Sequence, residues 1–211
     1  MTGPSSTRPR DPLAYERGCW GRGVSTIAGV DEVGRGPLAG PVVACAVVLP
    51  PDVVVEGADD SEVLDAARRE ELALAIRSRA LAVALGAASV REIDRLNILR
   101  ATTLAMRRAL ARLPVRPDHV VVDGLPVRGL DRQHDAVVGG DGQVHCISCA
   151  SIVAKVVRDD LMRRLAPRYP GFGWETNAGY GTLAHREALE TLGATPHHRL
   201  TFLGLQYELE L

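Results

Sequence analysis

The chain has 211 residues, of which 46% are hydrophobic and 24% are charged, and its formal net charge is −1. These values are typical of one soluble globular domain, and no apolar run approaches the ~18 residues of a membrane span, which excludes a helical membrane-spanning protein. Because the N-terminus also lacks an apolar signal core, we expect a cytoplasmic protein.

The N-terminal part of the chain predicts an arm, a helix and two strands. Residues 1–12 are polar and proline-rich, as in a disordered arm, and 13–20 fit a short helix that glycines stop. Apolar strands are expected over 26–31 and 41–49. The second strand is too apolar for one face to be wet, so we place it in the centre of the sheet.

The middle of the chain predicts three helices around one strand. The first helix would run from about Ser61, its N-cap, to about Arg79. A strand follows over 81–89, and then a short helix over 89–96. A longer helix over 97–113 is indicated by apolar residues that recur at helical spacing.

The C-terminal half alternates strands and helices. We expect strands over 119–124 and 136–141, helices over 147–162 and 182–192, a glycine-rich loop over 169–181 and a tail over 196–211. The order of elements predicts an α/β domain over 13–211, in which helices flank a mixed five-stranded sheet and a small helical part lies at the C-terminus.

Carboxylates stand where three of the apolar strands are expected to end. They are Asp31 and Glu32, Asp123, and Asp141. Strand ends at one edge of a sheet converge, and four converging carboxylates repel one another unless divalent cations lie between them. Oxygen ligands suit Mg²⁺ or Mn²⁺, and two such ions ~3.5–4 Å apart are the arrangement for phosphodiester hydrolysis.

Each carboxylate also has an ordinary structural interpretation. Taken alone, Asp123 before Gly124, and Asp141 within Gly-Gly-Asp-Gly, are typical of turns. Asp31 and Glu32 are adjacent, so a regular strand would send them to opposite faces. Both reach one site only if the strand ends or twists at this point.

Two further groups of residues suit contacts to a nucleic acid. Gly34 and Gly36 let backbone approach a sugar–phosphate chain closely, and Arg35 offers forked donors. The glycine spacing departs from a dinucleotide-binding fingerprint, and a strand follows where that fingerprint needs a helix. Ser151 and Lys155, the only lysine, lie one helical turn apart, so Lys155 could contact a phosphate or a carboxylate.

The cysteines carry less information. Cys146 and Cys149 have the spacing of a redox pair or of half a zinc site, but no second pair accompanies them. We therefore expect structural thiols, and leave a redox role open.

Several motifs together resemble bacterial ribonuclease HII, in the order of that family and over residues 13–205. The motifs are Gly29-Val-Asp-Glu-Val-Gly-Arg-Gly-Pro-Leu-Ala-Gly-Pro-Val42, Leu96-Asn-Ile-Leu-Arg-Ala-Thr-Thr-Leu-Ala-Met-Arg-Arg-Ala109, Val121-Val-Asp-Gly124, Gly140-Asp141, Ala150-Ser-Ile-Val-Ala-Lys-Val-Val-Arg-Asp159, Gly179-Tyr180-Gly-Thr182 and His197-His-Arg199.

The resemblance implies a ribonuclease H-like fold and a monomeric endonuclease that acts on RNA/DNA hybrids and on duplex DNA with embedded ribonucleotides. It implies cleavage 5′ to the ribonucleotide, leaving 5′-phosphate and 3′-OH ends, and a role in ribonucleotide removal from DNA. The ligands of Mg²⁺ or Mn²⁺ would be Asp31, Glu32, Asp123 and Asp141. Gly34, Arg35 and Gly36 match the segment that senses the ribose 2′-OH, and Tyr180 matches the tyrosine that stacks on the next deoxyribose.

Two departures from the family pattern weaken the expected grip on duplex. Glu62 replaces a basic residue, which Arg68 or Arg69 could offset, and Asn177-Ala178 replaces His-Lys. The alternatives are therefore a relative that binds hybrid with weakened catalysis, and another nuclease on the same fold.

Overall fold

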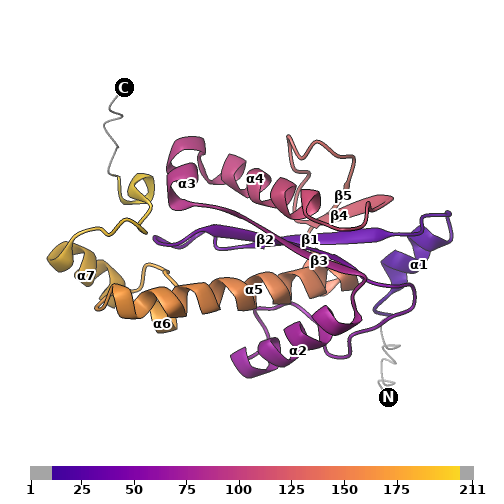
Figure 1. Cartoon of the computed structure of the whole chain (residues 1–211), viewed down its shortest axis with the longest axis horizontal. Helices are drawn as coiled ribbons and strands as arrows, with labels where there is room; N and C mark the ends of the chain where they lie inside the picture. Colours follow the sequence, from indigo (N-terminus) through magenta and orange to yellow (C-terminus); the bar gives the residue numbers. More distant parts are fainter. Residues whose placement is uncertain (1–10, 205–211) are drawn as a thin grey trace, which may run out of the picture.

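A computed structural model describes residues 11–204, and its centre is one five-stranded mixed sheet (Figure 1). The strands are β1 (Ile27–Val33), β2 (Val42–Val48), β3 (Ala82–Ala88), β4 (His119–Asp123) and β5 (Asp135–Val137), in the spatial order β3-β2-β1-β4-β5. β2 is antiparallel to β1 and β3, whereas β4 is parallel to β1 and β5. All seven residues of β2 are buried, as its composition predicts.

Helices cover both faces of this sheet, as Figure 1 shows. The helices are α1 (Ala14–Trp20), α2 (Ala66–Arg79), α3 (Val90–Leu96), α4 (Ile98–Ala111), α5 (His145–Leu165), α6 (Trp174–Asn177) and α7 (Leu183–Leu192). One core joins α4 to the face of β1 and β2 that carries Val30 and Ala44, and a second core joins α2 and α5 to the face that carries Cys45.

Glycine allows α5 to lie directly on β1. A Cβ atom added to Gly29 would lie 2.3 Å from the backbone carbon of Cys146, which is too close for any side chain. The first turn of α5 therefore rests on the strand that carries Asp31, and this contact fixes where the helix runs relative to the carboxylates.

The structure corrects two expected boundaries. α2 begins at Ala66 with Asp65 as its N-cap, not at Ser61, because Ser61 is buried and its hydroxyl lies 2.8 Å from that of Ser151. β5 ends at Val137, so Asp141 lies on a separate 3-10 turn (Gly140–Gly142) rather than on the strand.

The C-terminal part packs around the end of α5. Its small core includes Met162, Phe172 and Trp174, and a 3-10 turn (Leu200–Leu203) closes the described chain. Of the expected arm and tail, residues 1–10 and 205–211 lie outside the described residues. No helix within residues 11–204 is long and apolar enough to cross a membrane.

Candidate active site

The parallel pairing of β1 with β4 brings two of the predicted carboxylates to one edge of the sheet. Asp31 and Asp123 each follow directly on the paired residues Val30 and Val122. The third, Asp141, arrives on the turn after β5, and the backbone N–H of Gly140 donates to Asp123 Oδ1 at 2.6 Å. Residues from three segments of the chain therefore meet here.

Burial and mutual repulsion raise the pKa values of these carboxyl groups. Asp31 is buried, and burial and then the charge of Glu32 hold its pKa well above the usual value, with a smaller effect of Asp123. Burial and then the charges of Asp123 and Asp60 likewise raise the pKa of Asp141, and the effect of Asp60 could not be expected from its place in the sequence. The edge is thus a cluster of negative charge.

Glu32 does not turn to the face of Asp31. β1 continues to Val33, so regular alternation sends Asp31 towards α5 and Glu32 towards the α4 side, where Arg35 Nη1 donates to Glu32 Oε1 at 3.1 Å. Burial raises the pKa of Glu32, and the charge of Asp123 adds to this effect. Glu32 is therefore coupled electrostatically both to Asp31, whose pKa its charge raises, and to Asp123 at the end of β4, while Arg35 opposes the rise in its own pKa.

The donor set fits a hard divalent cation. It consists of carboxylate oxygens whose repulsion a cation would relieve, and such ligands favour Mg²⁺ or Mn²⁺ over zinc. Within residues 11–204, no three His, Cys, Asp or Glu side chains already enclose a position for an ion. The fit rests on the chemistry and mutual electrostatics of the donors.

The turn formed by Gly34, Arg35 and Gly36, called here the glycine turn, lies beside Tyr180. Gly34 has φ +88°, and a Cβ atom there would lie 2.0 Å from Arg158 Nε. A Cβ atom on Gly36 would lie 3.6 Å from Tyr180 Cε1, and 42% of Tyr180 is exposed. The two elements that the resemblance assigns to sugar contacts are thus adjacent at the surface.

Ser151 and Lys155 have different environments although they share a helix face. Ser151 is buried, and its hydroxyl lies beside Ser61 and hydrogen-bonds Asp31, which opposes the rise in the pKa of Asp31. Lys155 pairs with Asp159 at 2.7 Å and lines a groove of about 270 Å³ that Tyr180 also lines. Of the two residues, only Lys155 opens onto this groove.

The basic residues suggested as replacements are engaged within the chain. Arg68 pairs with Glu71, and Arg69 donates to the carbonyl oxygens of Ser61 and Leu64. Asn177 also has a structural part, since its amide donates to the carbonyl oxygen of Phe172 and its Oδ1 accepts from the N–H of Gly179.

Two buried arginines were missed by sequence reasoning, although both lie in the quoted motifs. Arg158 donates to the carbonyl oxygens of Pro41, Ala178 and Ala39. Arg199 donates to those of Gly40, Arg35 and Gly34. Because these carbonyl groups are distant in sequence, no local pattern could reveal the contacts.

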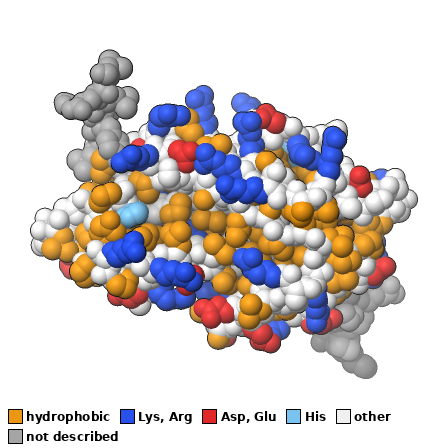
Figure 2. Space-filling view, viewed as in Figure 1, with side chains coloured by type: hydrophobic (Ala, Val, Ile, Leu, Met, Phe, Trp, Pro, Cys, Tyr) orange, Lys and Arg blue, Asp and Glu red, His pale blue; other side chains and the backbone are white. Residues whose placement is uncertain are grey.

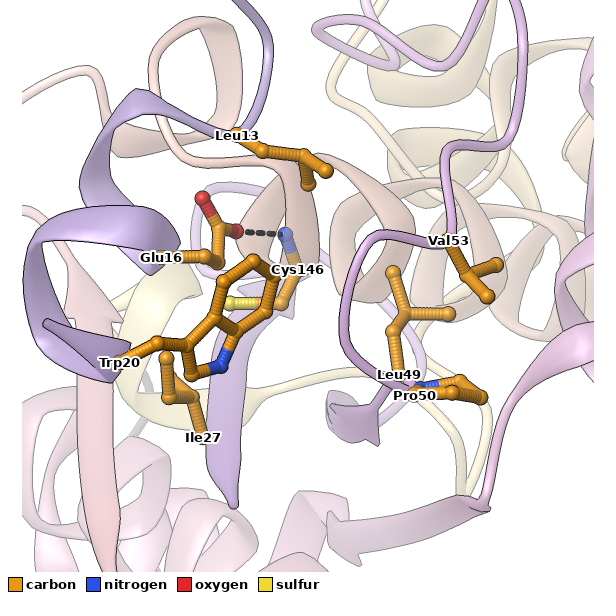
Figure 3. Close-up of a pocket in the computed structure, with 8 residues that line it drawn as sticks. All are labelled: Leu13, Glu16, Trp20, Ile27, Leu49, Pro50, Val53 and Cys146. Carbon is orange, nitrogen blue, oxygen red and sulfur yellow. Dashed lines mark hydrogen bonds between the residues drawn. The ribbon is translucent and has the colours of Figure 1, made fainter. Parts of the chain in front are cut away.

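The four cysteines are buried free thiols. Cys146 borders a small cavity of about 10 Å³ that Glu16 and Trp20 of α1 also line (Figure 3). Burial raises the pKa of the Cys146 and Cys149 thiols, which disfavours the reactive thiolate. The surroundings favour the structural interpretation of this pair.

Comparison with known proteins gives a family. A family model described as Ribonuclease HII matches residues 28–204. The chain is 58% identical over 177 residues to a ribonuclease HII of Ruegeria pomeroyi, covering 83% of this chain and 75% of that protein. It is 57% identical over 182 residues to one of Paracoccus denitrificans, covering 85% and 86%.

Solved structures agree with this result. The ribonuclease H2 of Pyrococcus horikoshii is similar with a TM-score of 0.72 and 28% identity, over 83% of this chain and 93% of that one. The Bst-RNase HIII crystallised with Mn²⁺ shares the fold, with a TM-score of 0.70 and 20% identity, over 95% and 74%.

Proposed function

Since this chain belongs to the ribonuclease HII family and is a ribonuclease H endonuclease, we propose that it cleaves 5′ to single ribonucleotides embedded in duplex DNA, as well as within the RNA strand of hybrids. One observation carries the proposal. The carboxylate cluster lies at the end of β1, and the glycine turn beside Tyr180 follows directly on that strand. A phosphodiester at the cluster would therefore have its ribose within reach of the turn.

The carboxylates Asp31, Glu32, Asp123 and Asp141 would hold Mg²⁺ or Mn²⁺. When bound, two such ions would supply activation of the attacking water and charge stabilisation at the leaving 3′ oxygen. Water adds to phosphorus and the bond to the 3′ oxygen breaks, which leaves 5′-phosphate and 3′-OH ends. The chain itself orients two of these carboxylates, Asp31 through Ser151 and Asp123 through the N–H of Gly140.

Recognition of the sugar falls to backbone and to one aromatic ring. The glycine turn would donate N–H groups to the ribose 2′-OH, which identifies RNA at one position without reading the base. Tyr180 would stack on the following deoxyribose, and Lys155 beside it would contact a phosphate. A ribose at the glycine turn and a deoxyribose at Tyr180 together identify the junction between RNA and DNA.

The surface supplies positive charge for a duplex despite the net charge of −1. Figure 2 shows basic side chains gathered over α3 and α4, where all of them are arginines. Exposed arginines there include Arg91, Arg95 and Arg100, for which no ion pair exists within residues 11–204. Such residues neutralise phosphates without reading the base sequence. This suits a monomeric enzyme that removes ribonucleotides from DNA, because these can occur in any sequence.

The test is cleavage of a labelled duplex with one ribonucleotide, with Mg²⁺ or Mn²⁺, beside an all-DNA duplex of the same sequence. We expect a single cut on the 5′ side of the ribonucleotide and no cut in the control. Binding without cleavage would instead support a catalytically weakened relative. Cleavage of the all-DNA duplex would support a different nuclease on this fold.

A further inference from the structure

Arg199 is a buried cation without a carboxylate partner. The residue is 0% exposed, and within residues 11–204 no carboxylate oxygen lies within ion-pair distance of it. Its guanidinium group donates hydrogen bonds to three backbone carbonyl oxygens, at 3.0 Å to that of Gly40, 2.9 Å to that of Arg35 and 2.5 Å to that of Gly34. The Phe202 ring also lies 5.1 Å from its Cζ atom, so the charge is stabilised without a counter-ion, and the carbonyl groups of the glycine turn are among its main partners.

The contacts of Arg199 fix the direction of two peptide groups in the glycine turn. In a trans peptide, the carbonyl group of one residue and the N–H group of the next point in opposite directions. Because Arg199 holds the carbonyl oxygens of Gly34 and Arg35, the N–H groups of Arg35 and Gly36 point away from it. Both residues are exposed, and neither N–H has an acceptor in the described part of the chain.

The segment that carries Arg199 also connects the glycine turn to the loop of Tyr180. The N–H of Arg199 donates to the carbonyl oxygen of Leu38, and the N–H of Leu38 donates to that of Gly179, next to Tyr180. Arg158 supports the same turn from beneath Gly34. The two sugar-contacting elements therefore share one support at the C-terminal end of the described chain.

We infer that Arg199 is a positioning residue for ribonucleotide specificity, which aims the Arg35 and Gly36 N–H groups at the ribose 2′-OH by holding the carbonyl groups behind them. This inference rests on the proposed function and adds a specificity-determining residue to it. Lysine at this position would keep the charge but could not hold three diverging carbonyl groups with one ammonium group.

The experiment compares the full-length wild type with Arg199→Lys. It measures kcat/KM on the single-ribonucleotide duplex and the Ki of an all-DNA duplex of the same sequence as competitor. The control is Arg79→Lys, because Arg79 of α2 also donates to a carbonyl oxygen, that of Val54, away from both the glycine turn and the basic surface over α3 and α4. Assays are run at least 10 °C below each melting temperature, so that unfolded protein does not contribute.

We expect Arg199→Lys to lower kcat/KM at least fivefold while the Ki for DNA changes less than twofold, and Arg79→Lys to match the wild type. A smaller loss in kcat/KM, or a parallel change in Ki, would overturn the inference. If Arg199→Lys shows no cooperative melting, Arg199→Gln is judged by the same criteria, and failure of both to fold would assign a purely structural role. A wild type that leaves the ribonucleotide uncut would refute the proposed function instead.

Discussion

At Asp31, the proposed chemistry opposes the stability of the fold. The carboxyl group is buried beside Glu32, and both effects raise its pKa well above the usual value. A group whose pKa is raised on folding gives its full stabilisation below the unfolded pKa, and this stabilisation is lost as pH rises through the folded pKa. At neutral pH, Asp31 therefore lowers the free energy of unfolding in metal-free protein.

We predict that Asp31→Asn abolishes turnover and makes the metal-free protein more stable at pH 7. Removing the buried charge should raise the melting temperature by at least about 2 °C, the shift that ~1 kcal/mol gives in a domain of this size. Cleavage assays with Mg²⁺ or Mn²⁺ measure turnover, and thermal melts in EDTA measure the stability of the metal-free protein. Glu187→Gln on the exposed side of α7 is the control and should change neither. Retained turnover would remove Asp31 from the metal site.

Tyr180 should affect single ribonucleotides more than continuous hybrids. Its ring is exposed beside Gly36, where it would stack on the deoxyribose that follows an embedded ribonucleotide. We predict that Tyr180→Ala lowers kcat/KM on the single-ribonucleotide duplex about tenfold more than on the hybrid, which corresponds to about 1.4 kcal/mol. Tyr180→Phe keeps the ring and should stay near the wild type. An equal loss on both substrates would argue against the stacking role.

At the scale of the elements, the N-terminus of α5 is capped by a residue that is far away in the sequence. Its N-cap, Val144, supplies no side-chain hydrogen bond, and Glu16 of α1 instead accepts from the N–H of Cys146 at 2.9 Å (Figure 3). A carboxylate at a helix N-terminus is favourable because the free N–H groups carry partial positive charge. α1 thus anchors the start of the helix that carries Ser151 and Lys155.

We predict that Glu16→Ala lowers the free energy of unfolding by about 1–3 kcal/mol, the cost of leaving a buried donor without a partner. Glu16→Gln keeps an acceptor for the N–H of Cys146 and should retain most of the stability. Urea unfolding of both variants measures the difference. Equal stabilities of the two variants would show that Glu16 contributes packing and not a hydrogen bond.

The sequence predicted elements whose determinants are local. The short helix α3 begins where Ser89 and Glu92 form a capping box, and β2 is an interior strand between β3 and β1, as its wholly apolar sequence predicts. The convergence of Asp31 with Asp123 could also be predicted, since it follows from strand order. These features need only neighbouring residues or a regular sheet.

The features that the sequence left open depend on distant contacts. Ser61 would cap a helix in isolation, but it is buried against Ser151 of α5, so the helix starts later, at Ala66 with Asp65 as its N-cap. The support of the glycine turn by Arg199 joins residues more than 150 positions apart. Neither contact has a local pattern, because it forms only when the chain has folded.

Over the whole molecule, buried carboxyl groups and buried histidines act on stability in opposite directions. Burial raises the pKa of Glu16, Asp31 and Glu32, so their effect is to lower stability as pH rises above about 4. Burial, and then the neighbouring His185, lower the pKa of His198 to about 4, so that its contribution is lost as pH falls from about 6.5. The two effects oppose each other between these limits.

The histidine effect has a geometric cause. The N–H of Thr195 donates to His198 Nδ1, so His198 Nε2 carries the proton and donates to His185 Nε2 at 2.9 Å. His185 Nδ1 in turn donates to the carbonyl oxygen of Tyr180. A second proton on His198 would require Nδ1 to face another N–H, and this conflict favours the neutral pair in the folded state.

We therefore predict that the wild type loses little stability between pH 6.5 and 4. Single variants should show a steeper or shallower dependence of the free energy of unfolding on pH, because each removes one of the two opposing effects. Asp31→Asn removes a carboxyl group whose pKa is raised in the folded state. The free energy of unfolding of this variant should therefore fall more steeply on acidification than that of the wild type. His198→Gln removes a histidine whose pKa is lowered in the folded state, so the free energy of unfolding of this variant should fall less steeply on acidification. Each change in slope should be at most about 1.4 kcal/mol per pH unit for one proton. Urea unfolding at four pH values in EDTA measures the slopes, and comparing slopes separates titration from any constant loss of packing. Parallel curves for the three proteins would show that neither group titrates differently in the folded and unfolded states.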